Sequence, residues 1–179
     1  MKKKNLIKIL VPCLILLVVG GIYFFKNSPT KNQEQENVTT LEDTVFVLTA
    51  TEAIDFEALA EYGLPIIVDY GSDSCIPCQQ MAPVLETMNE EMAGKAFIKF
   101  VDVWKYTDAA NNVPVQVIPT QVLVNADGTP FVPSDELAQT IEFILYSSRE
   151  TGEHVFTVHQ GGMTEEQMRL ILTEMGVGA

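Results

Sequence analysis

The sequence contains little cysteine, histidine and positive charge, and each shortage excludes a class of function. Three cysteines and two histidines occur in 179 residues, and 24 acidic side chains outnumber 11 basic ones, giving a formal net charge of −13. An acidic surface repels nucleic acid, and no basic patch exists outside the extreme N-terminus, so we exclude DNA and RNA as partners. Hydrophobic residues make up 47 % of the chain, which excludes wholesale disorder.

The shortage of cysteine and histidine also argues against a zinc site. Such a site needs four ligands, usually from two Cys-x-x-Cys pairs or from one pair with two histidines. The chain has one pair, Cys75 and Cys78, and its third cysteine, Cys13, lies in an apolar run. His154 and His159 are five residues apart in a segment with strand alternation, so they should point to opposite faces. We expect no metal site and interpret both histidines as exposed strand residues.

The N-terminal segment predicts a membrane anchor. An apolar run over residues 9–25 follows four lysines, and about 17 residues are the lower limit for a spanning helix. Positive charge before the run places the N-terminus in the cytoplasm and the rest of the chain outside. We expect a single-pass protein of the cell membrane with an extracytoplasmic domain. Secretion after signal cleavage is the alternative, although "IYFFKNSPT" is a poor cleavage site.

These patterns divide the chain into three parts. Residues 1–25 form the basic tip and anchor, residues 26–43 are polar and indicate a linker, and residues 44–178 form one domain. Within the domain, apolar runs predict strands over residues 45–50, 64–70, 96–104, 120–126 and 153–160. Amphipathic spacing predicts helices over residues 54–62, about 75–94, 134–149 and 164–176, and a short helix or turn over 106–113. Strand–helix–strand order favours parallel pairing, with the last two strands antiparallel at one edge.

The pair Cys75 and Cys78 is interpreted as redox-active. A disulfide across two intervening residues closes almost no loop and would stabilise the fold little, although a structural staple remains the alternative. Cys75 would begin a helix, whose N-terminal amides and dipole favour a thiolate, and Pro77 suits its first turn. Cys75 would then attack a substrate disulfide, and Cys78 would release the reduced substrate.

Two further features lie outside the cysteine turn. Asp69 stands in an apolar strand six residues before Cys75, where burial would raise its pKa. It either accepts the proton of Cys78 or points outward at the strand end. In "VIPT" (117–120), Pro119 precedes a strand, and a cis Ile118–Pro119 bond would present the Ile118 backbone to a substrate chain.

Together these residues resemble the thioredoxin superfamily, over about residues 44–178. The matching segments are "IIVDYGSDSCIPCQQMAP" and "VIPTQVLVNADG", in which the family positions are occupied by Asp69, Cys75, Pro77, Cys78, Pro83, Ile118, Pro119 and Thr120. The resemblance implies an α/β thioredoxin fold, a central mixed sheet flanked by helices, with an inserted helix within an insertion at about 131–152. It implies no cofactor beyond the Cys75–Cys78 disulfide. It also implies catalytic roles for Cys75, Cys78 and Asp69. Contacts with the substrate are implied for Ile76, Pro77, Ile118 and Pro119.

The sequence departs from the family pattern at several positions. Ser74 stands where the family usually has tryptophan, and Ile76 where it usually has glycine. Gln79 replaces a common basic residue. Phe100 aligns with the basic residue expected near the aspartate, and Lys99 lies one position away. These departures affect redox potential and partner choice more than the fold.

The sequence also resembles tethered thioredoxin-like proteins outside bacterial membranes. That resemblance implies a monomeric extracytoplasmic protein disulfide reductase, reduced by a membrane electron-transfer protein and acting on disulfide-bearing exported proteins or apocytochromes. Thiol oxidase or isomerase activity is one alternative. The other is a non-catalytic, membrane-tethered interaction module, in which the helix at 134–149 docks a membrane partner.

Overall fold

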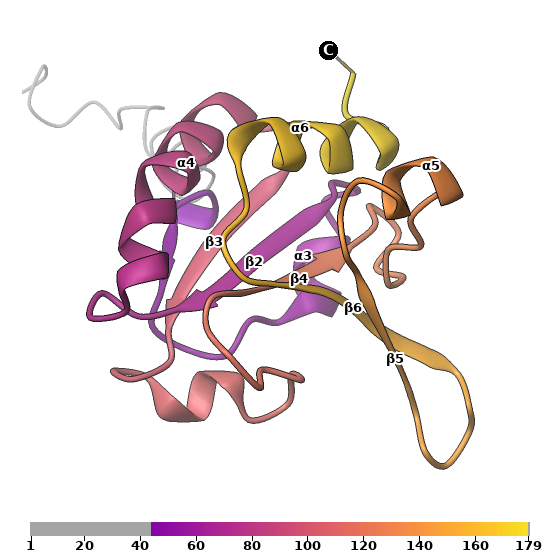
Figure 1. Ribbon diagram of the computed structural model, residues 1–179, viewed down its shortest axis with the longest axis horizontal. Helices are drawn as coiled ribbons and strands as arrows, with labels where there is room; N and C mark the ends of the chain where they lie inside the picture. Colours follow the sequence, from indigo (N-terminus) through magenta and orange to yellow (C-terminus); the bar gives the residue numbers. More distant parts are fainter. Residues whose placement is uncertain (1–43, 179) are drawn as a thin grey trace, which may run out of the picture. The chain divides into compact units, whose positions relative to one another are not determined.

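The computed structural model describes residues 44–178, which form a six-stranded mixed sheet with helices on both faces (Figure 1). The strand order is β1-β3-β2-β4-β6-β5. Strands β1, β3 and β2 are parallel, and each later strand is antiparallel to its neighbour. The strands are β1 (Thr49–Ala50), β2 (Ile66–Gly71), β3 (Phe97–Asp102), β4 (Thr120–Val124), β5 (Ile144–Ser147) and β6 (His154–Gln160).

The helices cover two separate hydrophobic cores. They are α3 (Phe56–Ala60), α4 (Ile76–Met92), the 3-10 helix η1 (Thr107–Ala110), α5 (Asp135–Ala138) and α6 (Glu165–Glu174). Helices α4 and α6 pack on the face to which Ile67 belongs, while α3 and η1 cover the face of Ile66 and Val68. Strand β2 is buried along its whole length. This burial on both faces explains its nearly continuous apolar sequence.

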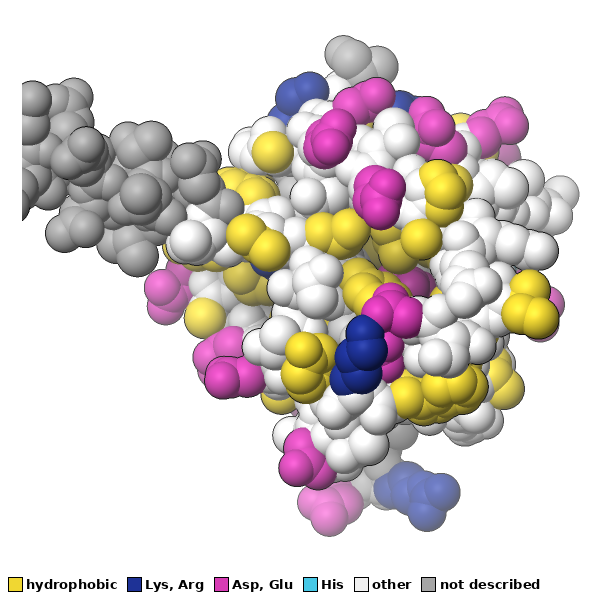
Figure 2. All heavy atoms as spheres, turned by 90° about the vertical axis from the view of Figure 1, so that its left-hand side faces the viewer, with side chains coloured by type: hydrophobic (Ala, Val, Ile, Leu, Met, Phe, Trp, Pro, Cys, Tyr) yellow, Lys and Arg dark blue, Asp and Glu magenta, His cyan; other side chains and the backbone are white. Residues whose placement is uncertain are grey.

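Local sequence signals account for the elements around the cysteine turn. Helix α4 begins directly after Cys75, with a proline in its first turn, and continues through Pro83 to Met92. Helix α6 begins with a capping box, in which the side chains of Thr164 and Gln167 each bond the other's backbone N–H. The face seen in Figure 2 carries hydrophobic side chains between acidic ones, in keeping with the net charge of −13.

The predicted helix at 134–149 is wrong beyond its first turn. Helix α5 ends at Ala138, and residues 144–147 instead form β5, which pairs with β6 as a hairpin. The helical spacing of Ile141 and Leu145 is misleading, because Ile141 is buried whereas Leu145 is 50 % exposed. Bulky aromatic and branched residues at 143–146 suit a strand better than a helix.

The hairpin also changes the edges of the sheet. Gly152, with φ of +74°, belongs to the β5–β6 turn. Strand β5 is therefore the edge strand, and β6 lies inside the sheet, antiparallel to β4 as predicted. At the opposite edge, the predicted strand at 45–50 is reduced to β1, a two-residue strand.

The membrane prediction concerns residues that the structure does not describe. Within residues 44–178, no helix has the length and apolar character needed to cross a bilayer. The predicted anchor at 1–25, which includes Cys13, and the linker at 26–43 lie outside the described residues.

Candidate active site

The cysteine turn lies where β2 leads into α4. Cys75 and Cys78 form a disulfide, with their Cα atoms 5.2 Å apart. Cys75 is the N-cap of α4, and its Sγ accepts a hydrogen bond from the backbone N–H of Cys78 at 3.4 Å. The helix N-terminus thus directs an N–H group at the sulfur that the sequence predicts to be the nucleophile, which favours its thiolate.

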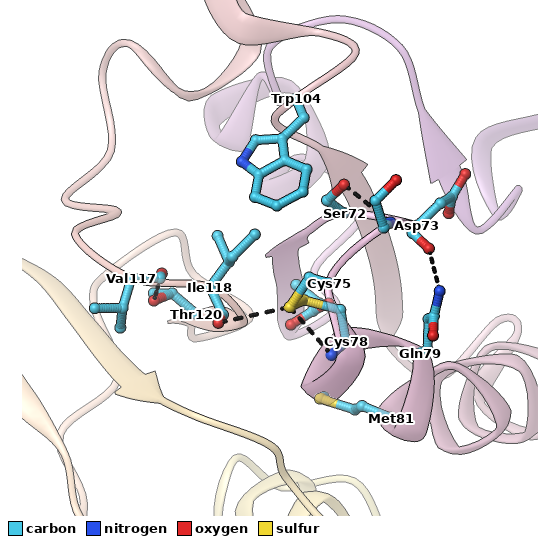
Figure 3. Close-up of a disulfide and its surroundings, with 12 residues drawn as sticks. Ser72, Asp73, Cys75, Cys78, Gln79, Met81, Trp104, Val117, Ile118 and Thr120 are labelled. Atoms are coloured by element: carbon cyan, nitrogen blue, oxygen red, sulfur yellow. Dashed lines mark hydrogen bonds between the residues drawn. A yellow bond between two sulfur atoms is a disulfide. The ribbon is translucent and has the colours of Figure 1, made fainter.

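The loop before β4 faces the disulfide from the other side (Figure 3). The Ile118–Pro119 peptide bond is cis, as predicted, and the carbonyl oxygen of Ile118 lies 3.8 Å from Cys75 Sγ. Thr120 donates its hydroxyl proton to the Val117 carbonyl at 2.7 Å, which fixes the turn. The structure therefore brings together residues more than 40 positions apart in sequence.

Apolar side chains are exposed on the cysteine turn and on the two loops beside it. Ile76, Trp104 and Val117 are 68 %, 61 % and 51 % exposed, and in Figure 3 the Ile118 side chain points toward the Trp104 ring. We refer to Ile76, Trp104, Val117 and Ile118 as the apolar rim. Sequence reasoning missed Trp104, although it is the single tryptophan of the chain and the last residue of the strand predicted over 96–104, which in the structure ends at Asp102. It occupies a different loop from Ser74, where the family usually has tryptophan.

Asp69 lies inside the domain on β2, so the outward-pointing alternative is wrong. Its side chain is fully buried, and its Oδ1 accepts a hydrogen bond from Gln121 Nε2 at 2.6 Å. Its Oδ2 has no hydrogen-bond partner within the described residues. Burial raises the pKa of Asp69 to about 7, and the hydrogen bond from Gln121 opposes that rise.

Gly71 connects this carboxyl to the cysteine turn. A Cβ atom at Gly71 would lie 3.1 Å from Asp69 Oδ2 and 3.2 Å from Cys78 Sγ. The carboxyl oxygen and the second cysteine sulfur therefore approach the same point, which is open because glycine has no side chain. On another side, Cys78 borders a cavity of about 250 Å³ that is also lined by Phe100 and Lys105. Sequence reasoning missed the role of Gly71.

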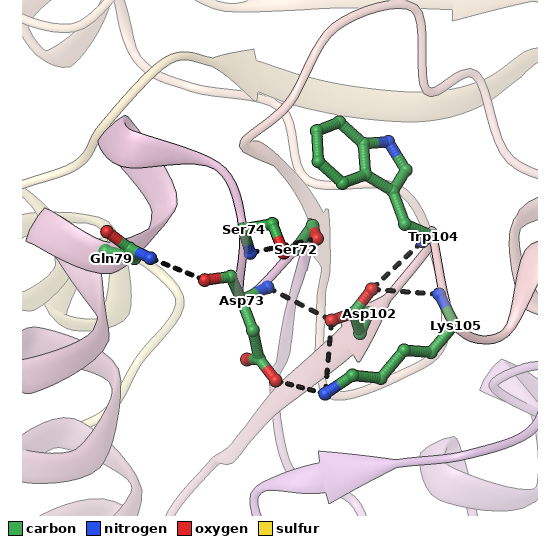
Figure 4. Close-up of polar contacts among 7 residues, drawn as sticks. All are labelled: Ser72, Asp73, Ser74, Gln79, Asp102, Trp104 and Lys105. Carbon is green, nitrogen blue, oxygen red and sulfur yellow. Dashed lines mark hydrogen bonds and ion pairs between the residues drawn. The ribbon is translucent and has the colours of Figure 1, made fainter.

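A second carboxylate, Asp102 at the end of β3, fixes the backbone of the segment that precedes the cysteine turn (Figure 4). Asp102 accepts backbone hydrogen bonds from Asp73, Trp104 and Lys105, each at 3.0 Å. The Lys105 ammonium forms an ion pair with Asp73 and lies 3.6 Å from Asp102 Oδ2. Burial acts to raise the pKa of Asp102, but the three backbone hydrogen bonds and the charge of Lys105 hold it below its ordinary value. The ionised carboxylate thus joins the segment before Cys75 to the loop of Trp104.

Comparison with known proteins agrees with this geometry. A family model described as Thioredoxin matches residues 45–142. The chain belongs to the thioredoxin family. Thioredoxin of Staphylococcus aureus is 34 % identical over 102 residues, which are 54 % of this chain and 95 % of that protein. With the Cys75–Cys78 disulfide at its site, this thioredoxin domain is a thiol–disulfide oxidoreductase.

Plant thioredoxins and solved structures also match. Chloroplastic thioredoxin Y of Oryza sativa is 32 % identical over 95 residues, 50 % of this chain and 56 % of that protein. The chain thus spans about half the length of this plant relative. The X-ray structure of Fasciola hepatica thioredoxin is 24 % identical, with a TM-score of 0.49, covering 72 % of this chain and 99 % of that one.

The thioredoxin domain has no lysine against its buried aspartate. Asp69 pairs with Phe100 in the β2–β3 register, whereas Lys99 pairs with Val68 and so belongs to the opposite face. Lys99 Nζ donates to the backbone carbonyls at 45 and 47, at 2.5 and 2.6 Å. The polar partner of Asp69 is instead Gln121, which sequence reasoning did not single out.

The interpretation of both histidines as exposed is wrong for this thioredoxin domain. His159 is buried, with Nδ1 2.8 Å from the Glu142 carbonyl, because the segment that joins α5 to β5 covers it. His154 is half-buried, and its Nε2 lies 3.0 Å from the Phe156 carbonyl. Among residues 44–178, no group of three or more histidine, cysteine, aspartate or glutamate side chains could hold a metal ion.

Proposed function

We propose that this thioredoxin is an extracytoplasmic protein disulfide reductase, held at the cell membrane by residues 1–25. One observation carries the proposed chemistry. The buried carboxyl of Asp69, whose pKa is raised to about 7, lies beside Cys78, the cysteine that must lose a proton to complete reduction. A base with a pKa near the working pH is the most effective proton acceptor for that step.

The first step is attack on the substrate. In the reduced enzyme, the Cys75 thiolate attacks one sulfur of a substrate disulfide, a new S–S bond forms, and the substrate's own S–S bond breaks. The second substrate sulfur leaves as a thiolate and takes a proton from solvent. The N–H of Cys78, which points at Cys75 Sγ, stabilises the attacking thiolate.

The second step releases the substrate. Asp69 accepts the thiol proton of Cys78, and the resulting thiolate attacks the sulfur of Cys75. The Cys75–Cys78 bond forms as the mixed disulfide breaks, and the second substrate sulfur leaves as a thiolate and takes a proton from solvent. Two electrons have then moved from the enzyme dithiol to the substrate, and Asp69 carries the proton until solvent removes it.

The substrate class follows from the apolar rim. A target cysteine must reach Cys75 between Trp104, Ile76 and the Ile118 loop, so apolar residues beside that cysteine favour binding. The backbone carbonyl of Ile118 lies 3.8 Å from Cys75 Sγ, so an extended substrate segment that reaches Cys75 would pair with the Ile118 backbone. Pro77 in the cysteine turn and Pro119 in the opposite loop would contact the substrate from its two sides. We expect the substrates to be extended or partly unfolded exported proteins, including apocytochromes.

A reductase outside the membrane needs a source of electrons. The two cysteines carry the electrons themselves, so no further cofactor is required, and a membrane electron-transfer protein with its own dithiol would return Cys75 and Cys78 to the reduced state. The lysines before the apolar run at 9–25 support this location. We propose that the enzyme works as a monomer, and secretion after cleavage is the alternative to anchoring.

The reduction potential of the full-length protein in detergent, equilibrated with dithiothreitol or glutathione buffers, tests the proposal. A value near that of thioredoxin, about −270 mV, supports a reductase, whereas one near about −120 mV, as in DsbA, indicates a thiol oxidase. If the Cys75–Cys78 pair exchanged with neither buffer, the protein would instead be a non-catalytic interaction module. Protease treatment of intact cells tests the location, because an extracytoplasmic domain is degraded while cytoplasmic proteins survive.

A further inference from the structure

A row of polar side chains crosses the buried sheet beneath the cysteine turn. Asp69 on β2 pairs with Gln121 on β4, and Gln121 pairs with His159 on β6. Directly paired residues of antiparallel strands share one face, so all three belong to the face covered by α4 and α6. Gln121 is fully buried, and a buried amide is costly unless its polar groups have partners.

The contacts of Gln121 fix the direction of its amide. Nε2 donates one hydrogen bond to Asp69 Oδ1 at 2.6 Å and lies 3.4 Å from Met81 Sδ as a second acceptor. Met81 is itself held, because the backbone N–H of Met163 donates to its sulfur at 3.4 Å. The amide nitrogen is therefore directed at Oδ1 of the carboxyl, and Oδ2 faces the point beside Gly71 that it shares with Cys78.

We propose that Gln121 is a positioning residue for the reductive reaction, holding the Asp69 carboxyl so that its free oxygen serves Cys78. The inference rests on the proposed function of Asp69 as proton acceptor. It assigns to Gln121 two effects, the orientation of the carboxyl and the stabilisation of its ionised form. A hydrogen bond donated to a carboxylate favours the charged state and so opposes the effect of burial.

The surroundings of Asp69 contain no charged group that takes over this role. From β3 the facing residue is the uncharged Phe100, since Lys99 belongs to the opposite face. Asp102, at the end of β3, is occupied by backbone N–H groups. From α4 the titratable neighbour is Cys78, and from β6 it is His159, whose Nδ1 lies on the Glu142 carbonyl. Within residues 44–178, Gln121 is thus the only hydrogen-bond donor to this carboxyl.

The test replaces the amide with an apolar side chain of similar length. In full-length Gln121→Met, the carboxyl loses its donor, and the pKa of Asp69 should rise by about one unit or more above that of the wild type. Carbon-13 NMR of the aspartate carboxyl groups, titrated in the oxidised and reduced proteins, measures this shift directly. The acid limb of the pH–rate profile for protein disulfide reduction should move upward by the same amount.

Two further variants keep the test decisive. Gln121→Glu has the same shape but replaces the donor with a second carboxyl, so the pair should lose its last proton at a higher pH than Asp69 does in the wild type, even if the methionine variant folds poorly. Thr157→Val is the matched control, because Thr157 is buried on β6 and bonds the Phe131 carbonyl. It should lower the melting temperature without moving the Asp69 titration or the acid limb.

The possible results separate this inference from the proposed function. If the wild type reduces disulfides but neither Gln121 variant moves the Asp69 titration upward, the positioning role is refuted. If the Thr157 control moves it equally, the effect is one of general stability, and the inference also fails. If the wild type reduces no protein disulfide at any pH, the proposed function fails, whereas an upward shift in the Asp69 titration would still support the contact.

Discussion

Asp69 Oδ2 and Cys78 Sγ lie 3.1 and 3.2 Å from one point, the position that a Cβ atom of residue 71 would occupy, and that point is open because residue 71 is glycine. The Asp69 carboxyl, whose pKa is about 7, can therefore accept or release a proton near neutral pH, close to the Cys78 sulfur that must become a thiolate. The sheet positions the carboxyl and helix α4 positions the sulfur. A change at Gly71 should therefore disturb their relationship without removing either group.

Gly71→Ala should slow the release step. The added methyl would lie 3.0 Å from Phe100 Cε2 and at nearly the same distance from the carboxyl and sulfur, so at least one must move. We expect a loss of about 1–3 kcal/mol in stability from overpacking and a longer-lived mixed disulfide. Rapid-quench gels with a disulfide-bearing protein measure that lifetime. Gly162→Ala is the control, because nothing lies within 4 Å of its Cβ position, and equal lifetimes in both variants would contradict the expectation.

The stability of the oxidised domain should fall as the pH rises from about 4 to about 7. The pKa of Asp69 is raised from 3.8 to about 7 in the folded state, so between these values the folded state holds a proton that the unfolded state has lost. The free energy of unfolding therefore decreases over this range. Asp69→Asn cannot ionise, and at pH 8 it should be more stable than the wild type by about 2–4 kcal/mol. Urea unfolding at pH 4 and pH 8 measures the difference, which should largely vanish at pH 4.

Asp102 provides a control of opposite sign. Burial acts to raise its pKa, but the backbone hydrogen bonds outweigh burial and hold the pKa below the ordinary value. It stabilises the fold above its unfolded pKa, and this contribution is lost as the pH falls through the folded pKa. Asp102→Asn should therefore be less stable than the wild type at pH 7, and the difference should shrink in acid. If both asparagine variants changed stability in the same direction at pH 8, this account of Asp69 would be wrong.

The sequence predicted the parts of the site that depend on neighbours along the chain. The continuous apolar run of β2, the Cys75–Cys78 spacing and the helical periodicity of α4 are local signals, and each is confirmed as structure. Even Pro119 belongs to a short motif at the start of a strand. Such features require no knowledge of which strands are neighbours.

The missed parts depend on contacts between distant segments. Gln121 meets Asp69 only because β2 and β4 pair in one particular register, and a shift by one residue would move the amide to the other face. Trp104 reaches the apolar rim through a loop whose course the sequence does not specify. The false helix at 134–149 arose because Ile141 and Leu145 have a spacing typical of helices, while pairing with β6 decided the outcome.

The two cysteines should have separate kinetic roles. Cys75→Ser removes the nucleophile and should abolish protein disulfide reduction. Cys78→Ser leaves the first attack intact but prevents release, so mixed disulfides should accumulate. Each variant is incubated with a substrate protein that carries a disulfide, and non-reducing gels then distinguish loss of the first attack from loss of release. Cys13→Ser is the control that should retain full activity. Undiminished reduction by Cys75→Ser would eliminate the mechanism.

Trp104 should determine affinity for protein substrates but not the chemistry itself. It is 61 % exposed on the apolar rim, and its backbone is fixed by Asp102, so its ring is presented to a partner at little entropic cost. Buried tryptophans at interfaces contribute about 2 kcal/mol or more. Trp104→Ala should thus raise KM for a protein disulfide by about 30-fold or more, with kcat little changed.

The matched measurements for Trp104 use a small substrate and a distant residue. Reduction of a small aromatic disulfide, which does not span the rim, should be nearly unchanged in Trp104→Ala. Leu170→Ala on α6 removes another exposed hydrophobic side chain and should leave KM for both substrates unaltered. Trp104→Phe should restore most of the affinity, because it returns an aromatic surface to the rim. A loss of kcat on both substrates would instead show that Trp104 supports the geometry of the cysteine turn, through Asp102 and the backbone of Asp73.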